Sequence, residues 1–504
     1  MDNNIYLKRW KEIIGERSFL ESTTTHYTYG ESAVFIQRAT FLFHKCLPQH
    51  QEVVPIIMGN TPEFVLTVLS LMACGKIPYP LETNNKLAEY HAKLSELCVD
   101  IIICDKVGSP IAEQLGISIL FLDEIMNSFI SSSSDGNDLP LDEISSHAKL
   151  ICATSGSTER PKKVVLSLGR LLQNARAHAD SIGITDEARI LSCLPFYHGF
   201  TLLTHIFTVI SRECTFIAGH DTSPKGISRL IKNFNVSYTS FVPALLDTIV
   251  HNFEYKLFDS PSLKYVSIGS APVSQNQIQT YQAYFVHQKL FITYGQTEAG
   301  PRISTLDVNS TTKEYWTTVG TPLVGGKVRI SSPNQQGVGE LQVQAKWQSL
   351  GYYNQEELSS ELWTDDGWLK TGDLAELTED GFIRLKGRSK QIIISGGVNI
   401  SPAEIESLLN SMPFVHASVV IPVPDRKRGE VPHAFIVSRD KTVTEKEVIK
   451  ILKKDLSIQK LPRRIHFINE IITTCIGKPD RKAMIEMFLK KNENLEHDTI
   501  RAKD

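Results

Sequence analysis

The chain has 504 residues, of which 41% are hydrophobic and 22% charged, which is ordinary for a globular enzyme of two or more domains. A net charge of −3 gives no reason to expect a nucleic acid or an acidic membrane surface as partner. The eight cysteines form no Cys-x-x-Cys pair, which argues against a zinc site or a disulfide framework. No apolar stretch is long enough for a membrane helix and the N-terminus lacks a signal pattern, so we expect a cytoplasmic protein with reduced thiols.

The first part of the chain alternates apolar strands with helices, which is typical of an α/β domain with mostly parallel strands. Thr61 and Pro62 form the start signal of a helix, as N-cap and first helical residue. The polar stretch 131–138 is expected to be a loop. Three apolar stretches are predicted to be buried strands: residues 53–58, 101–104 and 119–122.

The stretch Ala153–Lys163 is rich in small and hydroxyl-bearing residues. An apolar run at 149–152 predicts a strand before it, and a helical pattern from Leu168 predicts a helix after it. Backbone N–H groups, hydroxyls and the charge of Lys162 suit phosphate binding, but a plain surface turn is an equal alternative from these residues alone. The spacing differs from the Gly-Lys-Ser/Thr loop of the common NTPases.

Polar and small residues follow three of the next predicted strands. These groups are Pro195–Gly199, Gly269–Pro272 and Tyr294–Glu298. Ligands collect at the carboxyl ends of parallel strands, so we expect a binding site where these groups meet. The strands are predicted at residues 189–194, 214–217, 237–242, 265–268 and 290–293.

Beyond residue 320 the pattern changes to short strands of an antiparallel or barrel-like piece, at 327–330 and 339–344, with a hairpin near Asp380. Ser401 and Glu404 form a capping-box pattern that starts a helix at Pro402. Strands at 415–421, 434–438 and 465–468 and a helix at 444–456, whose lysines form a solvated face, indicate a small α+β domain. We place the boundary near Lys390, giving domains 1–389 and 390–504.

Taken together, five segments make the chain resemble the adenylate-forming superfamily of acyl-CoA synthetases, aryl acid ligases, firefly luciferase and peptide-synthetase adenylation domains. The resemblance implies an α/β fold: a large N-terminal domain of parallel-type sheets packed with helices, a small barrel-like β piece, and a small mobile α+β C-terminal domain. It also implies ATP and Mg²⁺ as cofactors. The segments are Thr154–Lys163, Tyr294–Glu298, Thr371–Asp373, Gly387–Lys390 with Ser395–Gly397 and Glu404–Glu406, and Gly477–Lys482.

The resemblance also implies roles for single residues. Thr297 would contact the α-phosphate, Glu298 would bind Mg²⁺, His198 would sit at the acyl pocket, and Lys478 would reach between the substrate carboxylate and the α-phosphate. Each of three residues also has a simpler interpretation. Glu298 could be a solvated carboxylate at a helix start, His198 a core histidine bonded to backbone, and Lys478 a surface charge. The nucleotide would be held by Thr154, Ser155, Gly156, Ser157, Thr158 and Lys162 at the phosphates, Ser270, Ala271 and Tyr294 at adenine, and Asp373 and Arg388 at the ribose.

The reaction that the resemblance implies is activation of a carboxylic acid to acyl-AMP, followed by transfer to the thiol of coenzyme A or of a carrier protein's phosphopantetheine. Lys390 would be the hinge, and Gly396 and Gly397 would line the thiol tunnel. Two alternatives are a stand-alone adenylation enzyme that loads a carrier protein and a pseudo-enzyme that binds nucleotide or acyl ligand. Charged Glu159 and Lys163, where relatives usually have glycine, are the departures that favour weak ATP use.

The identity of the acid is the open point. Tyr197 and His198 stand where relatives that take α-amino acids usually have an aspartate, which favours an acid without an α-ammonium. Arg302 could pair with a second carboxylate of the substrate, or form a structural salt bridge. The residues expected around the acyl pocket are His198, Ser240, Phe241, Gly269 and Arg302.

Overall fold

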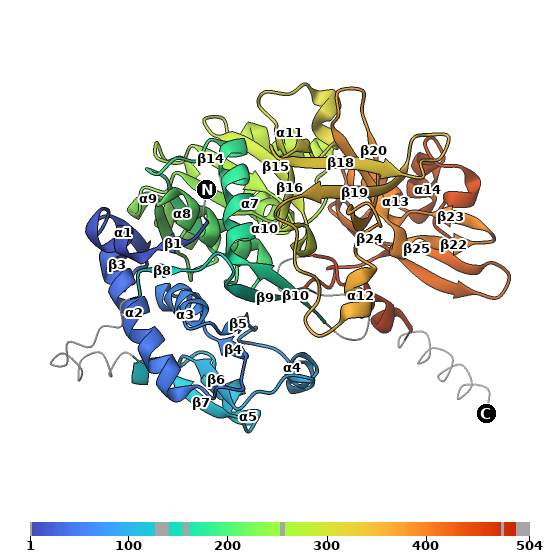
Figure 1. Ribbon diagram of the computed structural model, residues 1–504. Helices are drawn as coiled ribbons and strands as arrows, with labels where there is room; N and C mark the ends of the chain where they lie inside the picture. Colours follow the sequence, from blue (N-terminus) through green and yellow to red (C-terminus); the bar gives the residue numbers. More distant parts are fainter. Residues whose placement is uncertain (1–2, 126–140, 155–160, 253–257, 475–477, 490–504) are drawn as a thin grey trace.

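The computed structural model of the protein describes residues 3–125, 141–154, 161–252, 258–474 and 478–489 (Figure 1). The predicted loop at 131–138 and the phosphate-loop residues Ser155, Gly156, Ser157 and Thr158 lie outside these ranges. No helix in the described ranges combines the length and the apolar character that a membrane crossing requires.

The large N-terminal domain is built on a nine-stranded sheet in the order β17-β16-β15-β14-β13-β11-β12-β2-β3. From β2 to β15 neighbouring strands run parallel, and β3, β16 and β17 add antiparallel edges. All five strands predicted for its centre are present, within a few residues. The bounds are β2 (Ser18–Glu21), β3 (His26–Thr28), β11 (Arg189–Ser192), β12 (Thr215–Ala218), β13 (Tyr238–Phe241), β14 (Tyr265–Ile268), β15 (Lys289–Gly295), β16 (Arg302–Asp307) and β17 (Thr321–Pro322).

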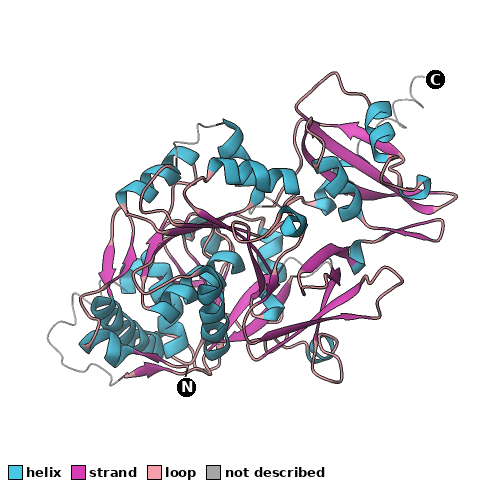
Figure 2. Cartoon of the chain, turned by 90° about the horizontal axis from the view of Figure 1, so that it is seen from above, coloured by secondary structure: helices cyan, strands magenta, loops and turns pink. Residues whose placement is uncertain are grey.

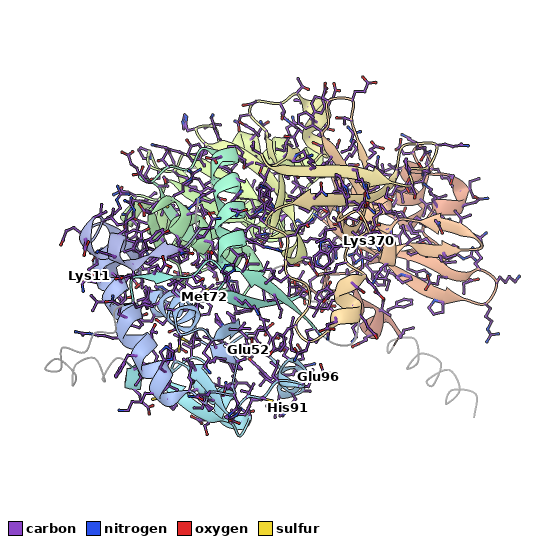
Figure 3. All side chains as sticks on the ribbon, in the orientation of Figure 1. Lys11, Glu52, Met72, His91, Glu96 and Lys370 are labelled. Atoms are coloured by element: carbon purple, nitrogen blue, oxygen red, sulfur yellow. The ribbon has the colours of Figure 1, made fainter. Side chains whose placement is uncertain are left out.

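A second, four-stranded parallel sheet has the order β5-β4-β6-β7 and confirms the three strands predicted early in the chain. Helix α3 (Pro62–Ala73) follows β4, and the Thr61 side chain accepts the N–H of Phe64 as predicted. This helix is buried along nearly its whole length, and Met72, labelled in Figure 3, belongs to that run. The strand bounds are β4 (Val53–Ile57), β5 (Ile77–Pro80), β6 (Ile101–Cys104) and β7 (Ser118–Phe121).

Helices cover both sheets, as expected when parallel strands are buried on both faces (Figure 2). The predicted apolar face of α7, from Leu168 to Ala179, is buried in the main core. The remaining elements of this part are β1 (Ile5–Tyr6), α1 (Leu7–Glu12), α2 (Tyr29–Cys46), α4 (Leu87–Leu94), α5 (Ser109–Gln114), β8 (Glu143–Ile144), α7 (Leu168–Ile182), α8 (Phe207–Arg212), α9 (Pro224–Asn233), α10 (Pro243–Asn252) and α11 (Gln275–Tyr284).

The phosphate loop does not lead directly into a helix, which corrects the predicted strand–loop–helix order. Strand β9 (Lys149–Thr154) pairs antiparallel with β10 (Lys162–Ser167), and α7 begins only after β10. The run Val164-Val165-Leu166 is buried, and its β-branched residues favour a strand. The loop therefore joins two strands of a hairpin, and Lys162 faces Thr154 across it.

An antiparallel sheet follows the large sheet, in the order β18-β19-β20-β21, and contains both strands predicted there and the hairpin near Asp380. Lys370 in Figure 3 marks β20, three residues before Asp373. The bounds are β18 (Gly326–Ser331), β19 (Gly339–Ala345), β20 (Leu369–Leu377) and β21 (Ile383–Arg388).

The smaller C-terminal domain forms the orange and red lobe at the right of Figure 1. Its sheet has the order β23-β22-β25-β24, with β26 beside β25, and two helices pack with it. The predicted strands and helices of this region are all present. The bounds are β22 (Ile393–Ser395), β23 (Val398–Ile400), α13 (Pro402–Asn410), β24 (Val415–Asp425), β25 (Gly429–Ser438), α14 (Glu445–Leu452) and β26 (Arg464–Phe467).

Helix α13 begins at Pro402 as predicted, but without the predicted capping box. The Ser401 hydroxyl donates to the carbonyl of Lys386 at 2.6 Å instead of capping the helix. The Glu404 carboxylate accepts from Lys460 Nζ at 2.8 Å. A Cβ at Gly387 would lie 2.4 Å from the Ser401 hydroxyl, so glycine is needed there. Both capping residues are therefore used for tertiary contacts.

Candidate active site

Tyr294, Asp373 and Arg388 form a hydrogen-bonded cluster, centred on the buried Asp373, where the large sheet meets the antiparallel sheet. The Tyr294 hydroxyl donates to Asp373 Oδ2 at 2.5 Å, and Arg388 Nε donates to Oδ1 at 2.8 Å. The pairing of β20 with β21 sets Asp373 directly opposite Arg388. Asp373 raises the pKa of Arg388, and burial together with Asp373 raises that of Tyr294. The structure thus brings together three residues predicted from three separate segments.

Lys478 reaches the same cluster from the C-terminal domain. Burial, and then the positive charge of Arg388, lower its pKa to about 8, while Asp373 acts in the opposite direction. Its charge also helps burial to lower the pKa of His198 to about 4. The turn that carries Lys478 is closed by a bond from the Thr474 N–H to the Lys478 carbonyl at 2.8 Å. Lys478 therefore lies within electrostatic reach of Arg388, Asp373 and His198.

Glu298 and Lys162 are joined through Tyr352, a residue that the sequence analysis missed. Lys162 Nζ donates to the Tyr352 hydroxyl at 3.3 Å and lies 4.6 Å from its ring centroid. The same hydroxyl donates to Glu298 Oε1 at 3.1 Å. Burial and Glu298 raise the pKa of Tyr352, which keeps its proton in place. Only the Gly-Tyr-Tyr turn marks this position in the sequence, and such turns are common.

Lys163 takes a different direction from Lys162. Successive side chains of a strand point to opposite faces, and Lys163 Nζ donates to the carbonyl of Ser95 at 3.3 Å. Its side chain is almost fully buried. Lys163 therefore points to the face of β10 opposite that of Lys162.

The sequence left two interpretations of His198 open, a residue at the acyl pocket and a core histidine bonded to backbone, and its contacts bear on both. Its Nδ1 accepts the backbone N–H of Phe200 at 3.1 Å, which assigns the proton of the neutral ring to Nε2. Burial, and then Lys478, keep it neutral. A Cβ on the next residue, Gly199, would lie 3.2 Å from Cys152 Sγ and 3.4 Å from Thr297 Oγ1, so Thr297 lies next to the His198 turn. The ring is backbone-bonded and also faces the Lys478 side of the site.

The segment after β14 lies beside the Tyr294 strand. Ser270 has a φ of +78° and, like Ala271, is half-buried. A Cβ on Gly269 would lie 2.6 Å from Thr293 Oγ1 and 2.9 Å from the Phe200 ring. Ser240 faces this region, whereas Phe241 points to the opposite face of β13 and packs against Phe258. The expectation that Phe241 lines the acyl pocket is therefore wrong, as the alternation along a strand dictates.

The predicted hinge and tunnel residues lie at the start of the C-terminal domain. Lys390 is exposed in a single helical turn (Ser389–Gln391), and its charge, after burial, lowers the pKa of Lys162. Gly396 and Gly397 form the turn between β22 and β23 with φ of +57° and +82°. These backbone angles favour glycine in their own right. A Cβ on Gly397 would meet no atom within 4 Å.

Comparison with known families matches the AMP-binding enzyme model to residues 8–353 and the AMP-binding enzyme C-terminal domain to residues 404–478. The chain belongs to the AMP-binding enzyme family. It is 26% identical to the 4-coumarate–CoA ligase-like 8 protein of Arabidopsis thaliana, over 95% of this chain and 90% of that one. It is 27% identical to the 2-succinylbenzoate–CoA ligase of Bacillus cytotoxicus, over 87% and 89%.

Among solved structures, the fold is shared with the o-succinylbenzoate coenzyme A synthetase of Bacillus subtilis in complex with ATP and magnesium ion. The TM-score is 0.83 at 24% identity, covering 96% of this chain and 99% of that one. Family membership and these ligase relatives confirm the predicted fold and reaction class. The protein is an AMP-forming acid–thiol ligase, which activates a carboxylic acid as an acyl-adenylate and passes it to a thiol.

Proposed function

We propose that the Asp373 cluster, Lys478, Thr297 and His198 form the catalytic site of an acyl-coenzyme A synthetase. The observation that carries this proposal is the position of Lys478, whose ammonium lies within electrostatic reach of Asp373, Arg388 and His198. A half-buried lysine within reach of both the Asp373 cluster and His198 suits the attack of a carboxylate on the α-phosphorus. That attack builds negative charge on the equatorial oxygens, which a desolvated ammonium stabilises.

The nucleotide side is suited to ATP. Asp373 already accepts from Tyr294 and Arg388, one on each oxygen, and a carboxylate has four lone-pair sites, so two remain for the ribose hydroxyls. Tyr294 on β15, and Ser270 and Ala271 just after the neighbouring strand β14, would border the adenine. Thr154 and Lys162, at the ends of the β9–β10 hairpin, would hold the phosphates together with the loop between them.

The residues around Glu298 fit a magnesium ion. Mg²⁺ in nucleotide sites is held by one or two carboxylates plus phosphate oxygens, and Glu298 supplies a half-buried carboxylate beside Lys162. When bound, the ion would neutralise charge on the phosphates. Tyr352 orients the Glu298 carboxylate and carries Lys162 against its ring, so it is a positioning residue for both.

The second half-reaction would use another placement of the C-terminal domain, with Lys390 as hinge between domains 1–389 and 390–504. Gly396 and Gly397 would then line the path of the thiol, because their turn leaves open space. We favour coenzyme A over a carrier protein as the acceptor, since the named relatives are coenzyme A ligases. The predicted cytoplasmic location stays a prediction.

Pyrophosphate release from ATP with fatty, aryl and amino acids, each with and without coenzyme A, tests this proposal. We expect release with one class of acid, increased by coenzyme A. Lys478→Ala should lower acyl-AMP formation by about 100- to 1000-fold yet largely spare thioester formation from supplied acyl-AMP. Exposed Lys482→Ala is the matched control. Equal loss in both half-reactions would show that the role of Lys478 is misassigned, and acid-dependent release indifferent to coenzyme A would argue for a carrier protein.

A further inference from the structure

A cluster of buried polar side chains lies behind Phe200, on the acyl side of the site. We call it the Arg302 cluster. Its members come from α7, from β13, β14 and β16, from a short π-helix (Phe200–Ile206) that follows His198, and from α8 directly after it. Such π-helical turns occur preferentially at functional sites. The cluster consists of His178, Thr204, His205, Thr208, Tyr238, Ser240, Ser267 and Arg302.

Arg302 is buried without an acidic partner. Its side chain is 4% exposed, and within the described ranges no carboxylate lies at ion-pair distance from it. One terminal nitrogen donates to Thr204 Oγ1 at 3.4 Å, the guanidinium stacks 4.5 Å from the Phe200 ring centroid, and Nε has no hydrogen-bond partner. An unpaired buried cation is costly to a fold and is normally neutralised by a neighbour or a ligand.

The neighbours of Arg302 present further unused polar atoms. His205 Nε2 contacts Ser240 Oγ at 2.6 Å, while its Nδ1 has no partner. His178 Nδ1 and Thr208 Oγ1 also lack partners. Buried polar atoms are nearly always hydrogen-bonded, so several orphans in one cluster point to a group that is supplied from outside the chain. Both imidazoles are neutral, because burial and Arg302 lower their pKa values, and the tautomer of His205 protonated on Nδ1 would donate to an anion.

Phe200 connects the cluster to the reaction centre. Its backbone N–H donates to His198 Nδ1. Its ring lies next to Gly269 and also stacks on the Arg302 guanidinium. His198 in turn lies within electrostatic reach of Lys478. An acyl chain that extends from Lys478 past His198 therefore meets Phe200 first and Arg302 next.

We propose that Arg302 is the anion-binding subsite of the acyl pocket, and that the substrate is an acid with a second, distal carboxylate. The distal carboxylate would pair with the guanidinium, including its unused Nε, and accept from His205, with the Phe200 ring moving aside to admit it. The other carboxylate would remain at Lys478 for adenylation. This inference rests on the proposed function, since it names the substrate class of the same site.

The test compares matched pairs of acids that differ only in the distal carboxylate: glutarate with pentanoate, adipate with hexanoate, suberate with octanoate. Pyrophosphate release gives kcat/KM for each acid with wild type, Arg302→Met and Arg302→Lys. We expect the best dicarboxylate to exceed its monoacid by about tenfold or more. Arg302→Met should lower kcat/KM for that dicarboxylate by roughly 100-fold and leave the monoacid unchanged or improved, with Arg302→Lys between.

Arg329→Met is the matched control, because Arg329 also stacks 4.5 Å from an aromatic ring, that of Trp368, but pairs with exposed Asp366. Calorimetric binding of the dicarboxylate without ATP separates this inference from the proposed function. Binding that Arg302→Met abolishes, with no pyrophosphate release, would support the subsite and overturn the proposed reaction. Release with monoacids at least equal to dicarboxylates, or equal losses for both in Arg302→Met, would overturn the subsite and leave the reaction standing.

Discussion

The proposed nucleotide side and the proposed acyl side of the site each contain one arginine, and the charges of the two arginines are balanced in opposite ways. Arg388 faces Asp373 across the β20–β21 hairpin, and this carboxylate raises its pKa. Arg302 is paired with no acid of the described chain, and burial lowers its pKa to about 10. One arginine is neutralised by the protein itself, and the other is not.

The proposed ligands of the two sides account for this difference. A ribose is neutral, so its site can carry a complete ion pair and still offer acceptor lone pairs on Asp373. A site for an anion must hold an uncompensated cation before the ligand binds, at some cost in stability. The comparison relates the charge balance of each arginine to the charge of its proposed ligand.

Asp373→Asn should remove the charge balance on the nucleotide side. Asparagine retains one acceptor but removes the charge, which leaves Arg388 unpaired and weakens the bonds to the ribose. We expect kcat/KM for ATP to fall by about 100-fold, with kcat/KM for the acid at saturating ATP nearly unchanged. ATP–pyrophosphate exchange at varied ATP measures this.

Asp366→Asn is the control for that variant, because Asp366 pairs with Arg329 on the same antiparallel sheet but in exposed positions. It should change exchange by less than about twofold. A fall of similar size in both variants would mean that Asp373 matters for the sheet and not for the nucleotide.

The nucleotide side could be predicted from the sequence because its residues lie in short segments with fixed spacing. Tyr294, Asp373, Arg388 and Lys478 were named from such segments, and the structure brings them together. Tyr352 could not be found, since its contacts depend on a turn packing against β10. The β10 strand itself was missed because a buried apolar run before a helix fits either a helix start or a strand.

The protonation state of Lys478 predicts how kcat/KM for the acid depends on pH. Burial and Arg388 lower its pKa to about 8, so the ammonium is present below pH 8 and lost above it. Because adenylation needs the cation, kcat/KM for the acid should be level below pH 8 and fall about tenfold per pH unit above it. Burial and Lys478 lower the pKa of His198 to about 4, so this residue stays neutral from pH 5 upward and adds no pH dependence to kcat/KM in that range.

Lys478→Arg provides the check on that assignment, because a guanidinium stays protonated throughout this range. Its activity should be lower overall but level to pH 9.5. Persistence of the limb near pH 8 in this variant would assign it to another group. Measurements of pyrophosphate exchange in constant-ionic-strength buffers are needed, since salt also screens the phosphates.

The acyl side could be predicted only in part. Arg302, Ser240 and Gly269 were named as pocket residues, and all three lie around Phe200 or the Arg302 cluster. Whether Arg302 had an acidic partner was left open, because a partner can come from any segment of the fold. Phe241 was placed on the wrong side, although the alternation Tyr238-Thr239-Ser240-Phe241 already separates it from Ser240.

Arg302→Met tests the acyl side by stability alone and gives the smallest effect. If the guanidinium is held unpaired for a ligand, its replacement by an apolar chain of similar length should stabilise the free protein by about 1–3 kcal/mol. For a domain of this size, that raises the midpoint of thermal unfolding by roughly 1–4 °C. Arg329→Met, which removes an exposed pair, should be neutral within about 0.5 kcal/mol.

A dicarboxylate should raise the midpoint of wild type but not of Arg302→Met. Destabilisation of the free protein by Arg302→Met would instead mean that the guanidinium holds the π-helix and Phe200 in place. The unpaired charge would then have a structural role and would not indicate a ligand.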